Sequence, residues 1–262
     1  MRFKSNFYPI LNTQTTLLGE LLMGIMNRSD VDKIIDGVID FISNRNVVLP
    51  KFGYFTLEDW SKLNLKEWQE VFDVELGWDV SDFGGNDFSK TGCVLFNFRN
   101  GSIAPVLKDL YQNPYAEKLL YVGQDQELPM HFNRHKMEDI INRGGGDLMI
   151  QLYNSTPDED LDKTKDLELT IDGQKLIYKA GSTICIKPGS SIRVTPLMYH
   201  RFWGEKMPVM TWEVSKTNDD HIDNRFLDNG DRFSEIVEDT QAKYVLCNEY
   251  EKILHVKKTN QE

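Results

Sequence analysis

Residues 129–146 read Pro-Met-His-Phe-Asn-Arg-His-Lys-Met-Glu-Asp-Ile-Ile-Asn-Arg-Gly-Gly-Gly. Two histidines, a lysine and a glutamate stand close together here, just before a glycine run that we expect to form a tight turn: His131, His135, Lys136 and Glu138. A further histidine, His200, lies in a separate apolar and aromatic segment. The two segments can converge if the intervening chain folds back. This pattern is typical of a divalent-metal site inside a β-barrel.

The composition is that of a soluble globular protein. The chain has 262 residues, with 40% hydrophobic and 27% charged residues, enough for one large or two small domains. Its net charge of -11 argues against nucleic acid or an anionic membrane as a partner, because both need a cationic face. Three scattered cysteines, no signal-peptide pattern and no apolar run of membrane-spanning length favour a cytoplasmic location.

The N-terminal third has helical signals. Apolar residues recur at intervals of three and four over residues 31–42, and Asp30 is the expected cap of this helix. Thr56 is expected to cap a second helix over residues 57–63, with Asp59 completing an imperfect capping box. A third helix is expected over residues 66–76, ending at Gly77.

From Cys93 onward the pattern changes to short strands separated by turns, which indicates an all-β sandwich or barrel. The charge-rich spacer 156–166 is expected to be a solvated loop between strands. Strands are expected at residues 94–98, 118–122, 147–153, 167–171, 174–178, 182–186, 191–194, 209–214 and 244–247.

Several long, colinear stretches over roughly residues 30–250 resemble the D-lyxose isomerase family, a cupin-fold branch of the sugar isomerases. The stretches include Gly77-Trp-Asp-Val-Ser-Asp-Phe-Gly84, Leu95-Phe-Asn-Phe-Arg-Asn-Gly101, Tyr115-Ala-Glu-Lys118, Glu138-Asp-Ile-Ile-Asn-Arg-Gly-Gly-Gly146, Tyr199-His-Arg-Phe-Trp203, Glu213-Val-Ser215, Asn218-Asp-Asp220, Asp223-Asn224 and Leu246-Cys-Asn-Glu-Tyr250. The resemblance implies a mainly β fold: a single cupin (jelly-roll) barrel with an N-terminal helical arm. We expect an extension over residues 1–29, the arm over 30–84 and the barrel over 85–262.

The resemblance also implies a divalent metal, with Mn²⁺ expected, and its ligands. These would be His131, Asn133, Glu138 and His200. The family pattern is His-x-His followed by Glu five residues later, and Asn133 stands where the second histidine belongs. An amide oxygen is a hard donor that suits manganese or magnesium, but it is less basic than imidazole, so metal affinity should fall. His135 is an alternative ligand, because residues 131, 133 and 135 share one face of an extended strand.

Aldose–ketose isomerisation moves a proton between C1 and C2 through an enediol, so it needs a base and a group that handles the oxygen protons. Glu213 is the first choice for the base, because strand alternation places it on one face with Val209 and Thr211. Lys136 is the acid or the stabiliser of the enediolate. Asp231 and Glu235, in an expected loop, are weaker candidates. Aromatic residues that could pack against the sugar are Phe132, Phe202 and Trp203.

The leading hypothesis is therefore an enzyme: a metal-dependent aldose–ketose isomerase, without an organic cofactor, acting on D-lyxose and on D-mannose. No cluster of Arg and Lys is evident near the site, which agrees with an unphosphorylated, neutral monosaccharide. A catalytically weakened sugar-binding cupin is a second hypothesis, and a cupin dioxygenase is a third that the family motifs disfavour. We expect a homodimer, with His221 and His255 as surface residues.

Overall fold

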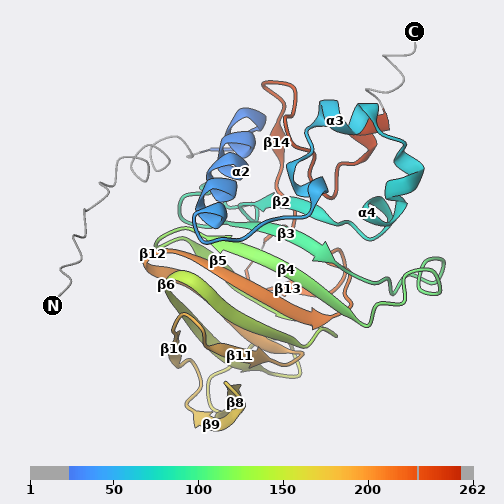
Figure 1. The fold of residues 1–262 in the computed structure, drawn as a ribbon. Helices are drawn as coiled ribbons and strands as arrows, with labels where there is room; N and C mark the ends of the chain where they lie inside the picture. The colour runs from blue at the N-terminus through green and yellow to red at the C-terminus, as the bar shows by residue number, and fades with distance from the viewer. Residues whose placement is uncertain (1–23, 229, 255–262) are drawn as a thin grey trace, which may run out of the picture.

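Two long strands, β6 (Glu138–Ser155) and β12 (Met198–Lys216), run antiparallel to each other and join the two layers of the structure (Figure 1). The first half of β12 pairs with β5, and its second half pairs with β4. This computed structural model describes residues 24–228 and 230–254. The mainly β, antiparallel fold expected from the sequence is confirmed.

The other strands flank this central pair. One layer has the order β2-β3-β4-β12-β6-β11-β8-β9, and β5, β10 and β13 belong to the opposite side. Their bounds are β2 (Gly77–Ser81), β3 (Cys93–Arg99), β4 (Tyr115–Val122), β5 (Glu127–Asn133), β7 (Leu161–Asp162), β8 (Leu167–Ile171), β9 (Gln174–Tyr178), β10 (Thr183–Ile186), β11 (Ser191–Val194) and β13 (Asn224–Phe226). A short parallel pair, β1 (Met26–Asn27) and β14 (Ile236–Val237), lies apart from them.

The first helix, α2 (Arg28–Ser43), covers the outer face of β2 and β3 (Figure 1). Its predicted apolar stripe is buried on the protein's own sheet, against Trp78, Val94 and Phe96 among others. Burial of each such side chain contributes about 1.5–3 kcal/mol. The cap was misassigned, because Asn27 precedes the first turn and Asp30 lies inside it. The helix begins at Arg28, whose guanidinium forms ion pairs with Glu238 and Glu249 far along the chain.

Other helical segments are short and include α3 (Leu57–Lys62), α4 (Gln69–Asp73), two 3₁₀ turns, Lys51–Tyr54 and Leu65–Trp68, and residues 251–254. Thr56 and Asp59 form a complete capping box, although Asp stands in place of the usual Glu. The predicted single helix over 66–76 is wrong, because the chain turns through Glu75 at φ 51° and Gly77 already begins β2. Among the described residues, no helix is long and apolar enough to cross a membrane.

The glycine run is part of a strand and not the tight turn that we expected. β6 continues through residues 144–146, where its pairing with β12 shifts register. A side chain on Gly145 would place its Cβ 2.0 Å from the carbonyl oxygen of Pro208, and one on Gly146 would lie 2.3 Å from that of Glu205. Glycine is therefore required because the two backbones approach closely where both strands pass between the layers.

Other strand predictions need correction or stay untested. Residues 147–153 and 209–214 are parts of the much longer β6 and β12. Residues 244–247 do not form a strand, because only Leu246 bridges to the edge strand β2, at Trp78. The spacer 156–166 contains β7, which pairs with the end of β6. The division at residues 29 and 84 stays a prediction. Residues 1–23 and His255 lie outside the described residues.

Candidate active site

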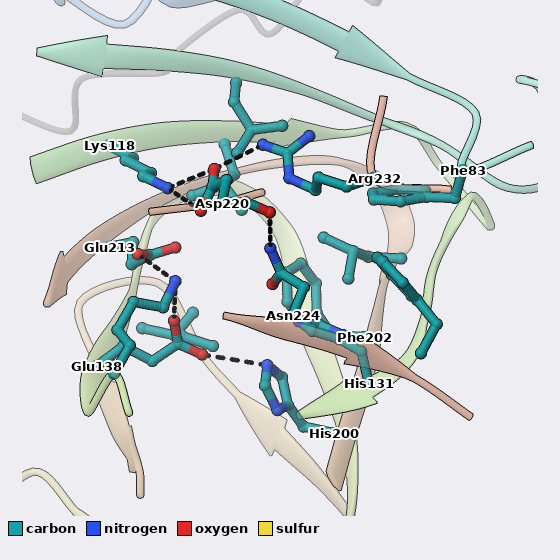
Figure 2. Close-up of a pocket in the computed structure, with 16 residues that line it drawn as sticks. Phe83, Lys118, His131, Glu138, His200, Phe202, Glu213, Asp220, Asn224 and Arg232 are labelled. Atoms are coloured by element: carbon teal, nitrogen blue, oxygen red, sulfur yellow. Dashed lines mark hydrogen bonds and ion pairs between the residues drawn. The ribbon is translucent and has the colours of Figure 1, made fainter. Parts of the chain in front are cut away.

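A narrow cavity of about 40 Å³ lies on the inner face of the sheet, between the two layers (Figure 2). Side chains from β3, β4, β5, β6, β12 and β13 line it, because alternate residues of each strand point inward. Its apolar wall consists of Phe83, Leu95, Leu120, Leu128, Ile140, Phe202 and Phe226. Polar and charged groups that contact one another occupy the rest of the lining.

Two histidines face each other across neighbouring strands. His131 on β5 pairs with His200 on β12, and their ring centroids are 4.2 Å apart, which confirms the predicted adjacency. The Nδ1 atoms lie 2.8 Å from the carbonyl oxygen of Pro129 and 3.0 Å from that of Met198. In a neutral His131 ring whose Nδ1 donates to Pro129, Nε2 keeps the lone pair that a metal ligand needs. Burial, with the neighbouring His200, lowers the pKa of His131 to about 3, so its ring is neutral.

Buried polar contacts extend from His200 through Glu138 and Lys136 to Glu213. Glu138 Oε1 lies 3.1 Å from His200 Nε2, and Glu138 Oε2 lies 2.8 Å from Lys136 Nζ. Lys136 also donates to Glu213 Oε1 at 2.8 Å (Figure 2). Burial opposes both charges, but the two carboxylates outweigh it and raise the pKa of Lys136, while Lys136 and His200 lower the pKa of Glu138. Lys136 therefore keeps its proton between the carboxyl groups of Glu138 and Glu213.

Local structure explains how Lys136 and Glu213 reach the cavity. Glu213 follows Val209 and Thr211 on the inward face of β12, and it is only 5% exposed. Lys136 lies in the connection between β5 and β6, where its backbone N–H donates to a carboxylate oxygen of the buried Asp223. This bond holds the connection against the site, so a residue outside any strand is directed inward.

A second polar group in the cavity was not predicted. Lys118 Nζ lies 2.8 Å from Asp220 Oδ2, and Arg232 donates to the same oxygen at 2.8 Å (Figure 2). Arg232 also pairs with Asp79, which is 1% exposed. Lys118 could have been found from strand alternation, because Leu120 and Val122 point inward with it. Asp220 and Arg232 lie outside the strands, so no periodicity marks them.

This group corrects the expectation that no Arg and Lys cluster accompanies the site. Lys118, Lys136 and Arg232 all line the cavity, but each one is paired with carboxylates. The cations were inconspicuous in the sequence because they come from three distant segments.

The other predicted site residues are not all brought to the cavity. Asn133 is buried beside it; its amide nitrogen donates to Glu138 Oε1 at 3.3 Å, and its amide oxygen is buried without a partner. His135 is exposed and follows the end of β5. Phe202 lines the cavity, but Phe132 packs edge-on against Tyr199. Three further candidates do not line the cavity: Trp203, Asp231 and Glu235.

A divalent cation needs several nitrogen or oxygen donors that converge on one point. In residues 24–228 and 230–254, no group of three or more His, Cys, Asp or Glu side chains converges closely enough to hold an ion by itself. The donor chemistry of His131, Glu138 and His200 nevertheless fits one. His200 Nε2 and Glu138 Oε1 lie 3.1 Å apart, so these two donors would be able to approach the same cation. Lys136 competes with a cation for Glu138.

Comparisons with known proteins agree with the geometry. A model of the D-lyxose isomerase family matches residues 26–250. D-lyxose/D-mannose isomerases of Serratia proteamaculans and Escherichia coli O157:H7 are each 44% identical over 227 residues, covering 86% of this chain and 98% of theirs. The L-ribose isomerase of Cellulomonas parahominis, solved with L-psicose, has a similar fold: the TM-score is 0.54 at 13% identity, covering 81% of this chain and 98% of that one.

Proposed function

This chain belongs to the D-lyxose isomerase family and is a sugar isomerase, and from that premise we propose its substrates and its mechanism. It interconverts D-lyxose with D-xylulose, and D-mannose with D-fructose, using a divalent metal for which Mn²⁺ is our first candidate. Support for the two aldoses comes from the relatives named D-lyxose/D-mannose isomerase.

One observation carries the mechanism: the continuous set of contacts from His131 through His200, Glu138 and Lys136 to Glu213. Glu213 accepts the proton from C2 of the aldose and returns it to C1, so no external oxidant or reductant is needed. The Lys136 ammonium, which donates to Glu213, stabilises the negative charge that develops on the sugar oxygens. It gives a proton to O1 as the enediol forms and takes the O2 hydroxyl proton as the ketose forms, so it ends the reaction protonated.

His131, Glu138 and His200 would hold the metal, with Asn133 as a fourth, weaker candidate. The metal when bound acts as a Lewis acid that polarises the carbonyl and hydroxyl oxygens of the sugar. The histidine Nδ1 bonds to Pro129 and Met198 orient both rings for this purpose. Apolar walls exclude water from the reacting carbons.

The second polar group is suited to a neutral sugar. Lys118, Asp220 and Asn224 offer donors and acceptors on one side of the cavity, and Arg232 adds a fork of N–H donors. Three cations, Lys118, Lys136 and Arg232, face four carboxylates, those of Asp79, Glu138, Glu213 and Asp220. The charge of these side chains is therefore 3 − 4 = −1 before a metal is counted, and each of the three cations is already paired with a carboxylate instead of being free for a phosphate group.

The proposal is tested with Glu213→Gln, which keeps the side-chain size and removes the base. Turnover of D-lyxose to D-xylulose should fall by about 10²–10⁴-fold, which is the rate enhancement that a positioned general base usually contributes. Metal content should not change, because Glu213 contacts Lys136 and not the histidines. Glu235→Gln, at an exposed position, is the matched control and should have normal activity.

Normal turnover in Glu213→Gln would contradict the assigned base. A metal-loaded wild-type protein that binds D-lyxose but does not convert it would instead support the sugar-binding alternative. The observation that favours this alternative is Asn133, whose amide nitrogen and not its oxygen faces Glu138.

A further inference from the structure

A row of four aromatic rings runs along one wall of the cavity. The ring centroids of His200 and His131 are 4.2 Å apart, and that of Phe226 lies 5.5 Å from His131. The ring of Phe83 follows at 5.5 Å from Phe226, and all four residues line the cavity. The row therefore leads from two of the proposed metal ligands to Phe83, a residue to which the proposed reaction assigns no role.

Phe83 lies at the end of the cavity away from the reacting groups. Figure 2 shows its ring beside Arg232, on the opposite side of the pocket from Glu138 and Glu213. In the proposed reaction these glutamates face C1 and C2 of the sugar, so the present inference rests on the proposed function. A sugar that is bound in this way extends its remaining carbons along the row of rings toward Phe83.

The backbone around Phe83 is strained and firmly held. Its φ is 54°, in the left-handed region that a bulky residue rarely adopts. Its N–H donates to Ser81 Oγ at 3.1 Å, and its carbonyl oxygen accepts from the backbone N–H of Asp231 at 3.2 Å. The carboxylate of Asp82 accepts from the N–H of Gly84 at 3.0 Å. Strain of this kind persists only where the surroundings hold it, so the ring is a fixed part of the wall.

The cavity has little free space. At about 40 Å³ it has room for about three water molecules, because one water needs about 10–15 Å³ of such volume. A sugar that enters must therefore press against the wall. D-mannose carries a hydroxymethyl group that D-lyxose lacks. In the open-chain form, which has the reactive carbonyl, this group is at the end of the molecule farthest from C1.

We propose that Phe83 determines the length of the sugar that this site accepts. Its ring packs against the C–H groups at the far end of a pentose chain and opposes the additional hydroxymethyl group of a hexose. Phe83 is thus a specificity-determining residue that contacts the far end of the substrate and not the reacting carbons.

The test compares kcat/KM for D-mannose with kcat/KM for D-lyxose in the full-length protein supplied with Mn²⁺. Phe83→Leu shortens the side chain and should raise the ratio of D-mannose to D-lyxose by about tenfold or more, because one methylene-sized group in a pocket changes discrimination by about 10–200-fold. Phe83→Trp enlarges the side chain and should lower the ratio by a similar factor. A residue that serves only in folding would change both values together and leave the ratio constant.

Phe88→Leu is the matched control. Phe88 is 5% exposed, as Phe83 is, but it packs in the core beneath α2 and does not line the cavity. This variant should lose stability without changing the ratio. If Phe83→Trp does not fold, Phe83→Leu and this control decide the question. An unchanged ratio in Phe83→Leu, or an equal change in Phe88→Leu, would overturn the proposal.

Failure of the proposed function has a different result: the wild-type protein would then convert neither sugar. In that case, isothermal titration calorimetry measures the Kd of D-lyxose and of D-mannose for the wild type and for Phe83→Leu. The ratio of the two Kd values should still change by about tenfold in favour of D-mannose. A constant Kd ratio, or binding of neither sugar, would overturn the role of Phe83.

Discussion

Asn133 is the residue that most affects how tightly the site can hold a metal. Its amide replaces the imidazole of the family pattern, and in the structure its nitrogen donates to Glu138 while its oxygen has no partner. Three other candidate ligands remain: His131, Glu138 and His200. We therefore expect the sequence change to weaken the proposed site without removing it.

We expect Asn133→His to tighten Mn²⁺ binding by about 10–100-fold and to raise turnover, because imidazole is the stronger donor. Glu138→Ala and His200→Ala should lose both metal and activity. His135→Ala should leave metal binding unchanged, because His135 is exposed. Metal titration of the four variants, with activity measured in parallel, decides the ligand set. Unchanged metal affinity in both Glu138→Ala and His200→Ala would rule out the proposed site.

Asp220 gives a prediction about pH. Burial opposes its charge, but Lys118 and Arg232 outweigh this effect and hold its pKa well below the usual range. A depressed folded-state pKa contributes stability above the unfolded pKa of about 3.9, and this contribution is lost as pH falls toward the folded value. The difference in unfolding free energy between wild type and Asp220→Asn should therefore be constant from about pH 7 to pH 5 and shrink only below about pH 4.

Urea denaturation at several pH values measures this difference. At neutral pH we expect about 3–5 kcal/mol, because the variant leaves Lys118 and Arg232 buried without their shared carboxylate. A difference that already shrinks between pH 7 and pH 5 would mean that another group is responsible.

At the scale of elements, the bend shared by β6 and β12 depends on glycine. Gly145 has φ +94°, and a Cβ there would lie 2.0 Å from the Pro208 carbonyl oxygen. We expect Gly145→Ala to cost about 3 kcal/mol or more, because backbone strain adds to the overlap. Gly173→Ala is the matched control: its φ is +83° but nothing lies within 4 Å, so it should cost only about 1–2 kcal/mol. Thermal denaturation measures both variants. Equal losses of unfolding free energy in Gly145→Ala and Gly173→Ala would show that the close approach of the two strands does not contribute.

Helices and strands could be predicted where residues close in sequence decide the local structure. The apolar stripe of α2, the cap at Thr56 and the hairpin strands β8 and β9 follow from periodicity and turn residues close in sequence. The lengths of β6 and β12 were not predictable, because their pairing continues through residues with no alternating pattern. Gly144–146 indicated a turn locally, and only the neighbouring strand makes them part of a sheet.

At the scale of the whole molecule, Arg28 ties the N-terminal helix to the C-terminal part of the chain. Its guanidinium is fully buried and pairs with Glu238 and Glu249, each at 2.7 Å. We expect Arg28→Ala to cost about 3 kcal/mol, near the lower end for buried pairs because Glu238 is 46% exposed. Lys33→Ala on the same helix removes an exposed ammonium from the buried Asp30, which keeps its hydrogen bond from Asn27, and should cost less than about 1 kcal/mol. Urea denaturation measures the stability of both variants. Similar urea midpoints for Arg28→Ala and Lys33→Ala would contradict the proposed contribution of the Arg28 ion pairs.

The sequence by itself determined the mainly β class, the amphipathic face of α2, the adjacency of the two histidine segments and the inward face of Glu213. These features depend on periodicity, or on motifs long enough to place the chain in a family. Only the tertiary structure decided that Lys118, Asp220 and Arg232 meet in the cavity, and that His135 is exposed. Lys118 and Asp220 are 102 positions apart in the chain. Their attraction becomes strong only where folding has removed both charges from water, and it must offset the cost of that removal, which no local pattern encodes.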